Sequence, residues 1–202
     1  MPQASLNVSA EPLDSDEMLM SRYGQGDNSA FEQLYLKHKG ALYRYFVRQL
    51  ADKQLAEDLY QETWGRVIKA AQSYQVSAKF TTWLYRIAHN LLIDHVRAVK
   101  PLEFVGDDET HVLDSARDYD GEPDVLLAME QKASLLKHCI GSLPQLQKEA
   151  FLLNVEMGFT AAMISDIAAV TLEATKSRIR YAYQSLTECV SRKWREETDE
   201  VR

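Results

Sequence analysis

Residues 80–99 read FTTWLYRIAHNLLIDHVRAV, a pattern that predicts an amphipathic helix from about Thr81 to Val99. Apolar residues recur every three or four positions, the spacing that places side chains on one side of a helix. They are Leu84, Ile87, Ala88 and Leu91, with His95 in line. The polar residues Arg86, Asn90, Asp94 and Arg97 follow another side. One side can therefore enter a core while the other stays available for binding.

Two helices are expected before this one. The first runs from Ser29 to about Leu50 and opens with the capping box Ser29-Ala30-Phe31-Glu32, in which the hydroxyl and the carboxylate satisfy backbone N–H groups. The second runs from about Leu55 to Ser73, and its outer side carries Glu57, Asp58, Gln61 and Glu62. Acids along the outside of one helix are either simply solvated or form a docking face for a basic partner. Since no strand-like alternation occurs, we expect an all-α fold.

A second helical segment follows residue 123. One helix is expected over 124–140, and another begins at Leu143-Pro144 and ends near Gly158. Thr160 can cap a short helix, residues 169–171 form a tight turn, and Thr171 can cap a longer helix. Two helices joined in this way predict a helix-turn-helix, whose second helix enters the major groove. The candidate DNA-contacting residues on it are Lys176, Ser177, Arg178, Arg180 and Tyr181.

The net charge of -7 is distributed unevenly along the 202 residues. Residues 27–100 hold 11 basic and 7 acidic side chains and residues 135–195 hold 8 and 5, whereas residues 101–134 hold 2 and 10. Two mildly basic blocks are thus separated by an acidic one, and it is the local field that matters to nucleic acid. We therefore divide the chain into an N-terminal extension (1–22), a helical domain (23–100), an acidic flexible linker (101–123), a helix-turn-helix domain (124–195) and an acidic tail (196–202).

Several function classes receive no support from the sequence. It contains no glycine-rich phosphate loop, no metal-binding His-Glu-x-x-His or Cys-x-x-Cys and no Gly-x-Ser-x-Gly, so we expect no catalytic residues, metal or cofactor. No apolar run is long enough to span a membrane, and the N-terminus does not resemble a secretion signal. Cys139 and Cys189 are too few for a disulfide scaffold and suit a reducing cytoplasm.

The segment around residue 80 combines aromatic, basic and amide side chains. Aromatic rings stack on unpaired bases while cations hold phosphates, which is how single strands are bound. Because Phe80 and Trp83 also fit a helix core, at least one of them is expected to be buried instead. The candidates for single-strand contact are Lys79, Phe80, Trp83, Arg86, Asn90 and Arg97.

The order of these motifs resembles a bacterial RNA polymerase sigma factor of the extracytoplasmic-function (ECF) group. Residues 27–99 resemble sigma region 2 through AEDLYQET (56–63), FTTWLYRIAHN (80–90) and IDHVR (93–97), and residues 143–190 resemble region 4 through Leu143-Pro144 and KSRIRYA (176–182). The family pattern has a glutamate at Met163, an alanine at Ser165, a glycine at Ala169 and a valine at Thr175. At Ala169 we therefore expect a positive φ that costs stability.

The resemblance implies a role for each surface. Asp58, Gln61 and Glu62 match the family's docking surface for the clamp helices of the largest polymerase subunit, and region 4 would meet the flap region. The segment from Ser73 through the following helix matches the reader of the minus-ten promoter element, which is held single-stranded with a flipped base. The helix-turn-helix matches the reader of the duplex minus-thirty-five element. An anti-sigma factor is a further expected partner, whereas membrane insertion is not expected.

Two other functions remain open from the sequence. A stand-alone helix-turn-helix regulator would bind duplex DNA tightly by itself and would not need Asp58, Gln61 and Glu62. A sigma mimic that sequesters an anti-sigma protein would give no transcription with core polymerase. The resemblance favours a non-enzymatic sigma factor that directs promoter recognition, promoter opening and transcription initiation.

Overall fold

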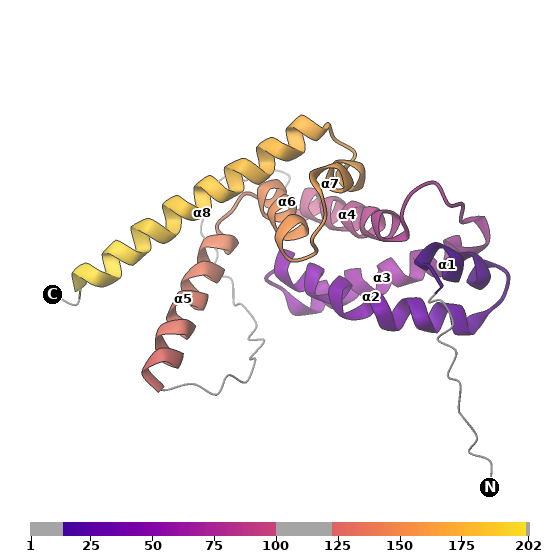
Figure 1. Cartoon of the computed structure of the whole chain (residues 1–202), viewed down its shortest axis with the longest axis horizontal. Helices are drawn as coiled ribbons and strands as arrows, with labels where there is room; N and C mark the ends of the chain where they lie inside the picture. The colour runs from indigo at the N-terminus through magenta and orange to yellow at the C-terminus, as the bar shows by residue number, and fades with distance from the viewer. Residues whose placement is uncertain (1–13, 100–122, 201–202) are drawn as a thin grey trace, which may run out of the picture.

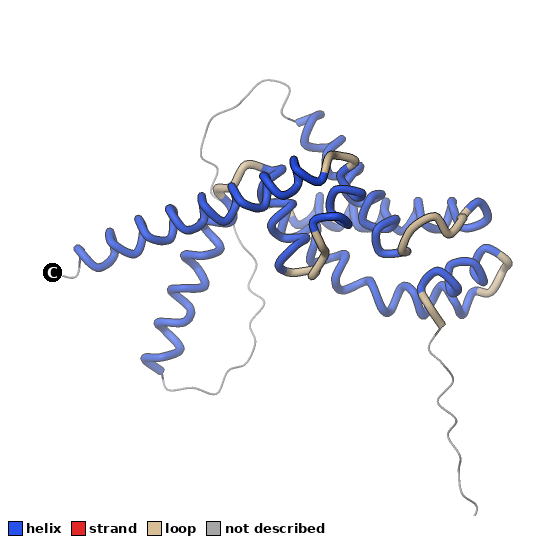
Figure 2. Tube along the Cα trace, turned by 45° about the horizontal axis from the view of Figure 1, so that its top comes forward, coloured by secondary structure: helices blue, strands red, loops and turns tan. Residues whose placement is uncertain are grey.

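The computed structural model describes residues 14–99 and 123–200, and the side chains within 14–99 and 132–195. Every regular element in these ranges is a helix (Figure 2), so the all-α prediction is confirmed there. In chain order the elements are α1 (Asp16–Gly24), α2 (Asn28–Gln49), α3 (Lys53–Ala70), η1 (Ala71–Ser73), α4 (Phe80–Val99), α5 (Pro123–Gly141), α6 (Gln145–Val155), α7 (Ala161–Ala168) and α8 (Leu172–Glu200).

Helices α1–α4 form a bundle at one end of the molecule, and α6 and α7 lie against it (Figure 1). Helix α8 starts beside α7 and runs away from the bundle as a long arm, with α5 packed beside it. We call α1–α4 with η1 the first module and α5–α8 the second module. The linker expected over 101–123 lies outside the described residues except for Pro123, which begins α5.

The ends of the first and second modules differ from the expected domain boundaries. Helix α1 includes residues assigned to an N-terminal extension, yet Leu19 and Met20 on it are buried in the core. Asp16 pairs with Lys37 at 2.6 Å and with His38 at 2.9 Å. Among the described residues the first module therefore begins with α1 and not at residue 23. At the other end, residues 196–200 of the expected tail continue α8.

The start of α2 corrects the expected capping box. The N-cap is Asp27, whose carboxylate accepts the backbone N–H groups of Ser29 and Ala30, and the Ser29 hydroxyl donates to it as well at 2.7 Å. An ionised carboxylate is favoured there because it meets the positive end of the helix dipole. The Ser29 hydroxyl, followed by the Arg22 guanidinium, lowers the pKa of Asp27 to about 2.

Gly24, the last residue of α1, permits a close helix approach. A Cβ atom at this position would lie 2.5 Å from the carbonyl oxygen of Ala71 in η1. No larger residue fits without moving backbone, so Gly24 lets α1 rest on the segment that leads into α4.

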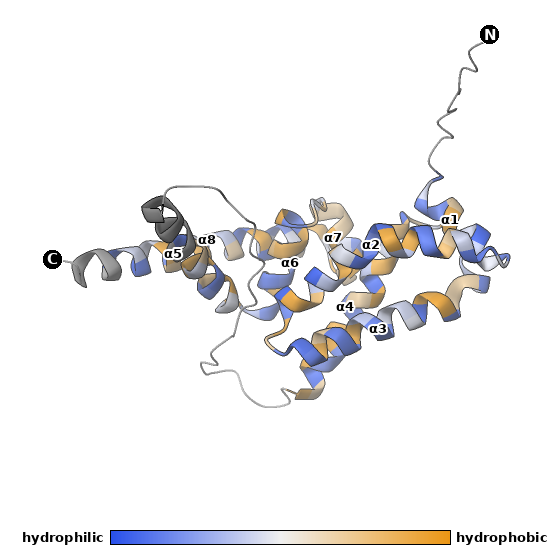
Figure 3. Cartoon of the chain, turned by 90° about the horizontal axis from the view of Figure 1, so that it is seen from below, coloured by the Kyte–Doolittle hydropathy of each residue, from blue (hydrophilic) through white to orange (hydrophobic). Residues whose placement is uncertain are grey.

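The two modules share one apolar core. Buried residues of α1–α4, including Phe46, Val67 and Leu84, belong to the same cluster as residues of α6, α7 and the loop between them. The second module contributes Ala150, Leu153, Phe159, Ile164 and Ile167 to that cluster. Figure 3 shows hydrophobic and hydrophilic residues alternating along these helices. The expected division into two helical domains is thus not a division into two separate cores.

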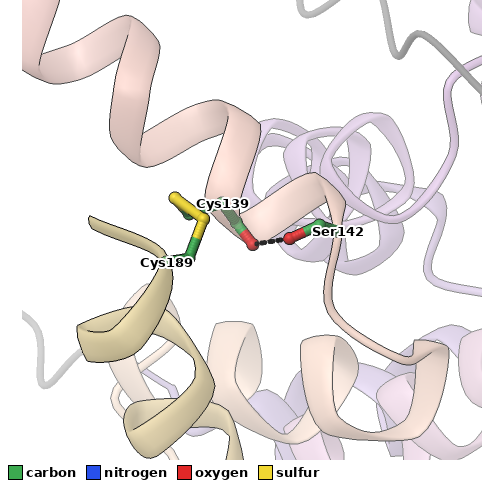
Figure 4. Close-up of a disulfide and its surroundings, with 3 residues drawn as sticks. All are labelled: Cys139, Ser142 and Cys189. Atoms are coloured by element: carbon green, nitrogen blue, oxygen red, sulfur yellow. Dashed lines mark hydrogen bonds between the residues drawn. A yellow bond between two sulfur atoms is a disulfide. The ribbon is translucent and has the colours of Figure 1, made fainter. Parts of the chain in front are cut away.

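A second core joins α5, α6 and α8, and it contains a disulfide. Leu135, Phe151, Leu152 and Leu186 pack there around Cys139 and Cys189. The two cysteines are bonded, with their Cα atoms 5.8 Å apart (Figure 4). The interpretation of the cysteines as reduced is therefore wrong for this structure. Cys139 lies on α5 and Cys189 on α8, and the two positions face each other where these helices pack. Their separation of 50 residues in the sequence gives no sign of this proximity.

The turn of the helix-turn-helix confirms the expectation for Ala169. This residue has φ 51° and ψ 45°, and it is the one non-glycine residue with positive φ among those described. A left-handed conformation costs an L-residue about 1–2 kcal/mol because its Cβ approaches the carbonyl oxygen.

Replacing Ala169 with glycine is expected to stabilise the protein by about 0.5–1 kcal/mol, since the relief of strain exceeds the extra chain entropy of glycine in the unfolded state. Thermal unfolding followed by circular dichroism measures the change. The matched control is Ala162→Gly on the exposed side of α7, where glycine only weakens a helix and should lower the melting temperature. Equal destabilisation by both substitutions would show that the left-handed conformation of Ala169 does not strain the backbone.

Candidate nucleic-acid interface

The predicted docking residues share one exposed side of α3. Asp58, Gln61 and Glu62 are all exposed, and the helical repeat of 100° per residue places them within an arc of about 100°. The opposite side of α3 holds the buried residues Ala56, Tyr60, Thr63 and Val67. Glu62 accepts from Arg66 at 3.0 Å, and Asp58 accepts from the Gln54 amide at 3.1 Å. The structure thus presents an ordered acidic surface on this helix.

Four of the predicted minus-ten residues share one side of α4. Trp83, Arg86, Asn90 and Arg97 fall within about 60° of arc at 100° per residue. The buried residues Leu84, Ala88 and Leu92 lie on the opposite side. Arg86, Asn90 and Arg97 are exposed and Trp83 is half-buried, with its ring 5.0 Å from the ring of Tyr74. This side offers two cations, an amide and an aromatic ring, which is a set suited to single-stranded nucleic acid.

Phe80 does not belong to that surface. Its side chain is fully buried, with its ring 5.4 Å from the His38 imidazole. The ring cannot stack on a base in this conformation, so the choice of Phe80 as a contact residue is corrected and the core alternative holds for it. The physical reason is its angular position, which turns it toward the apolar side of α4 at the point where α2 passes.

The segment before α4 borders an open hollow of about 700 Å³. Its lining comes from α1 and from residues 76–79: Ser15, Glu17, Met18, Ser21, Val76, Ala78 and Lys79. The Glu17 carboxylate accepts the backbone N–H of Phe80 at 2.7 Å, and so it fixes the start of α4. Burial is the largest single influence on the Glu17 carboxyl and by itself would raise its pKa. The hydrogen bonds from the Phe80 N–H, from its own backbone and from the Ser15 side chain together outweigh burial, so the pKa is lowered. The hollow is open to solvent, and its lining combines polar side chains such as Glu17 and Lys79 with apolar ones such as Met18 and Val76.

The predicted recognition residues differ in how far they lie from the buried side of α8. Ser177, Arg180 and Tyr181 occupy the centre of the side opposite the buried Thr175, Ala182 and Leu186, whereas Lys176 and Arg178 lie at its two edges. The Thr171 hydroxyl caps the helix by accepting the Ala174 N–H, and Lys176 pairs with Glu173 at 2.9 Å. The Arg180 guanidinium lies 5.0 Å from the ring centre of Tyr181. The side available for a major groove therefore carries three cations.

A polar cluster between the modules was not anticipated from the sequence. Glu149 of α6 is 3% exposed, yet its carboxylate accepts from the Tyr45 hydroxyl at 2.6 Å and lies 2.8 Å from Nδ1 of His89. Burial, followed by the charge of Glu149, raises the pKa of the Tyr45 hydroxyl well above its usual value. One signal was visible: Glu149 precedes the apolar run of residues 150–153 at a helical position that faces a core.

Arg86 also crosses between the modules. Its Nε and Nη2 atoms donate to the carbonyl oxygen of Asp166 at 3.1 and 2.7 Å. Asp166 lies in the last turn of α7, where carbonyl groups lack partners within the helix. The guanidinium therefore completes the end of α7 and meets the negative end of its dipole.

Within residues 14–99 and 132–195 no cluster of three or more His, Cys, Asp or Glu side chains is arranged to hold a metal ion. Among the described helices, none combines the length and apolarity needed to cross a membrane.

Comparison with known families identifies the first module. Residues 34–100 match the family model described as sigma-70 region 2, a span that includes the docking side of α3 and all of α4. The chain is also 28% identical to the RNA polymerase sigma factor CarQ of Myxococcus xanthus, over 84% of this chain and 94% of that protein. The protein is an RNA polymerase sigma factor of the ECF group. Over 38% of its length, this sigma factor is 40% identical to the ECF sigma factor SigW of Bacillus subtilis, of which it covers 41%.

Solved structures of sigma factors share the fold. CnrH, solved in complex with the cytosolic domain of CnrY, superimposes with a TM-score of 0.63 at 21% identity, covering 88% of this chain and 98% of that one. The sigma factor RpoE of Bartonella quintana, solved with the anti-sigma factor NepR, gives a TM-score of 0.61 at 22% identity, with coverage of 80% and 96%. These likenesses establish that the all-α architecture is shared with known sigma factors.

Proposed function

We propose that this sigma factor docks on core RNA polymerase through α3, reads a minus-ten element with α4 and the segment before it, and reads a minus-thirty-five element with α8. The observation that carries the proposal is the separation of charge on the first module. An exposed acidic side on α3 and a basic, aromatic side on α4 are held in one rigid bundle. RNA synthesis is left to the polymerase, and the chain acts in the cytoplasm, where the polymerase works.

The docking role is assigned to Asp58, Gln61 and Glu62. Their partner would be a basic helical surface such as the clamp helices of the largest polymerase subunit, since opposite charges steer association and fix orientation. The flap region is the proposed partner of the second module. Docking through the first module places α4 next to the DNA that the polymerase opens.

The minus-ten role is assigned to Lys79, Trp83, Arg86, Asn90 and Arg97. Lys79 and Arg97 would hold phosphates at the two ends of the α4 surface, and Trp83 would support unpaired bases between them. The hollow beside Lys79 accepts a base that leaves the stack, which would hold the strands apart. This arrangement couples sequence reading to promoter opening.

The minus-thirty-five role is assigned to Lys176, Ser177, Arg178, Arg180 and Tyr181. A helix inserted in the major groove can pair arginine with guanine through two hydrogen bonds, which is worth about 1–3 kcal/mol of discrimination per base. Cations at the edges of the inserted side would meet the phosphates that flank the groove.

The deciding experiment is run-off transcription with purified core polymerase on a library of promoters. A sigma factor causes transcripts to start at a defined set of promoters that the core enzyme alone ignores. Tight duplex binding by the free chain without redirected transcription would favour the stand-alone regulator instead. Binding to an anti-sigma protein with neither DNA binding nor transcription would favour the sigma mimic.

Reversing the charge at Asp58 and Glu62 to lysine is expected to weaken binding to core polymerase by about tenfold or more, because each lysine faces a basic surface at close range. Surface plasmon resonance on immobilised core enzyme measures the affinity. Glu32→Lys on the exposed side of α2 makes a similar substitution outside α3 and outside the second module, and it should leave the affinity unchanged. If the double variant bound as tightly as the parent chain, α3 would not be the docking surface.

A further inference from the structure

Helix α1 is fixed to the rest of the first module at both of its ends. At its start, Asp16 pairs with Lys37 and His38 of α2. At its end, Gly24 rests against the backbone of η1, and Met20 between the two ends is fully buried in the core. Because α1 cannot shift without breaking these contacts, its other side chains are held at defined places beside η1 and α4.

Glu17 of α1 reaches the first residue of another helix. Its carboxylate accepts the backbone N–H of Phe80, with which α4 begins, at 2.7 Å. The first N–H groups of a helix have no partner within it, so an acceptor from elsewhere in the chain serves as a cap. A carboxylate at this point also meets the positive end of the helix dipole. Glu17 is therefore a cap for α4 that lies 63 residues earlier in the sequence.

The capped residue lies between two of the residues proposed to contact the minus-ten strand. Lys79 directly precedes Phe80, and its carbonyl oxygen accepts the N–H of Trp83 at 3.1 Å. The buried ring of Phe80 lies 5.8 Å from the ring of Trp83. A shift of the Phe80 backbone would therefore displace a proposed phosphate contact on one side and a proposed base support on the other.

Glu17 also belongs to the wall of the hollow beside Lys79. Glu17, Met18 and Ser21 of α1 line it together with Val76, Ala78 and Lys79. The bond from Glu17 to the Phe80 N–H ties α1 to the residue that follows this second segment. It therefore holds the two walls of the hollow in place as well as the start of α4.

The charge of Glu17 would by itself have the opposite effect on DNA binding. A carboxylate beside a strand of phosphates repels it, so removal of the charge alone should strengthen binding. Loss of the cap should weaken binding, because the first turn of α4 is then held less firmly. The two effects of one substitution thus have opposite signs and can be told apart.

We propose that Glu17 is a positioning residue for minus-ten recognition, which caps α4 from α1 and so holds Lys79 and Trp83 in the arrangement that binds the opened strand. The inference rests on the proposed function of the α4 surface. It makes α1, which carries none of the residues proposed to touch DNA, a part of the promoter-reading structure.

The test measures the binding of single-stranded DNA by the assembled polymerase. The probe is a fluorescently labelled oligonucleotide with the nontemplate strand of a promoter recovered by run-off transcription, and a scrambled strand of the same composition is the comparison. E17A should lower the affinity for the promoter strand by about three- to tenfold, the range that loss of a helix cap supports. It should leave the affinity for the scrambled strand nearly unchanged, because general attraction to phosphates holds that strand.

Two further substitutions separate the hydrogen bond from the charge. E17Q removes the charge but keeps an oxygen that can accept the Phe80 N–H, so its affinity for the promoter strand should stay within about twofold of the parent chain. E17D keeps the charge on a shorter side chain and should lose affinity as E17A does. The matched control E32A removes an exposed carboxylate from α2 and should change neither affinity. All four variants should bind core polymerase as the parent chain does, since α3 is unaltered.

The outcomes distinguish this inference from the proposed function. If the parent polymerase does not favour the promoter strand over the scrambled one, the proposed reading of the minus-ten element fails. If it does, and E17A binds the promoter strand as tightly as the parent or more tightly, Glu17 does not position α4. Equal losses in E17Q and E17A would show that the charge matters and not the bond, which also overturns the inference.

Folding of the variants is checked by circular dichroism. Should E17A fail to fold, the comparison of E17Q with E17D decides the question. Parent-like affinity for the promoter strand in E17Q together with a loss in E17D supports the positioning role, and any other pattern contradicts it.

Discussion

Alanine at both Arg178 and Arg180 should weaken promoter binding by the assembled polymerase at least tenfold and make that binding less sensitive to salt. The two side chains lie on α8 at one edge and at the centre of its outward side. Each phosphate contact releases condensed counterions and adds about 0.9 to the slope of log affinity against log salt. Loss of two such contacts should therefore lower the slope by about two.

The measurement is a titration of promoter DNA at several salt concentrations. If either arginine instead contacts a guanine, the loss of affinity should be concentrated on promoters with that base, at about 1–3 kcal/mol per contact. The control variant R192A/K193A removes two cations farther along α8 and should leave the slope unchanged. An unaltered slope in R178A/R180A would show that these side chains do not touch phosphate.

Loss of the Cys139–Cys189 bond should produce the largest change in stability. The bond closes a loop of 50 residues that contains α6, α7 and most of α8. Cross-linking a loop of that length removes about 4 kcal/mol of conformational entropy from the unfolded chain. Reduction should lower the unfolding free energy of the second module by up to that amount. Helix α5 should lose order first, because α8 is its main packing partner among the described helices.

Chemical denaturation with and without a thiol reductant measures the difference. The variant C139A/C189A should resemble the reduced parent chain and should not respond to reductant, which separates the loss of the bond from other effects of the reagent. Identical denaturation curves for the oxidised and reduced parent chain would contradict the prediction. Since α1–α4 contain no cysteine, their packing should be affected only through the shared core.

Much of the architecture could be predicted because helices are local structures. The period of apolar residues placed α2, α3 and α4 within a few residues of their observed bounds. Thr160 and Thr171 were identified as caps, and each hydroxyl accepts an N–H three residues ahead. The cap of α2 was assigned two residues too late because Ser29 and Asp27 both fit the pattern, and only the hydrogen bonds distinguish them.

The sequence predicted some of the candidate surfaces better than others. The acidic side of α3 and the outer side of α8 follow from helical periodicity, since exposed residues recur at the same angles whatever packs behind them. Phe80 was misassigned because a phenylalanine side chain fits a core as well as a base-stacking site. Which of the two it occupies depends on the packing of α4 near His38 of α2. The hollow beside Lys79 needs α1, which was assigned to an extension.

The amino-acid order alone determined the approximate positions of α2–α8, the caps of α7 and α8 and the strained turn at Ala169, because each depends on residues within a few turns of one another. Only the tertiary structure decided that Cys139 bonds to Cys189, that Phe80 is buried, and that Glu149 enters the first module to meet Tyr45, 104 residues away in the chain. Such contacts depend on the distances and angles between packed helices, which local periodicity does not encode.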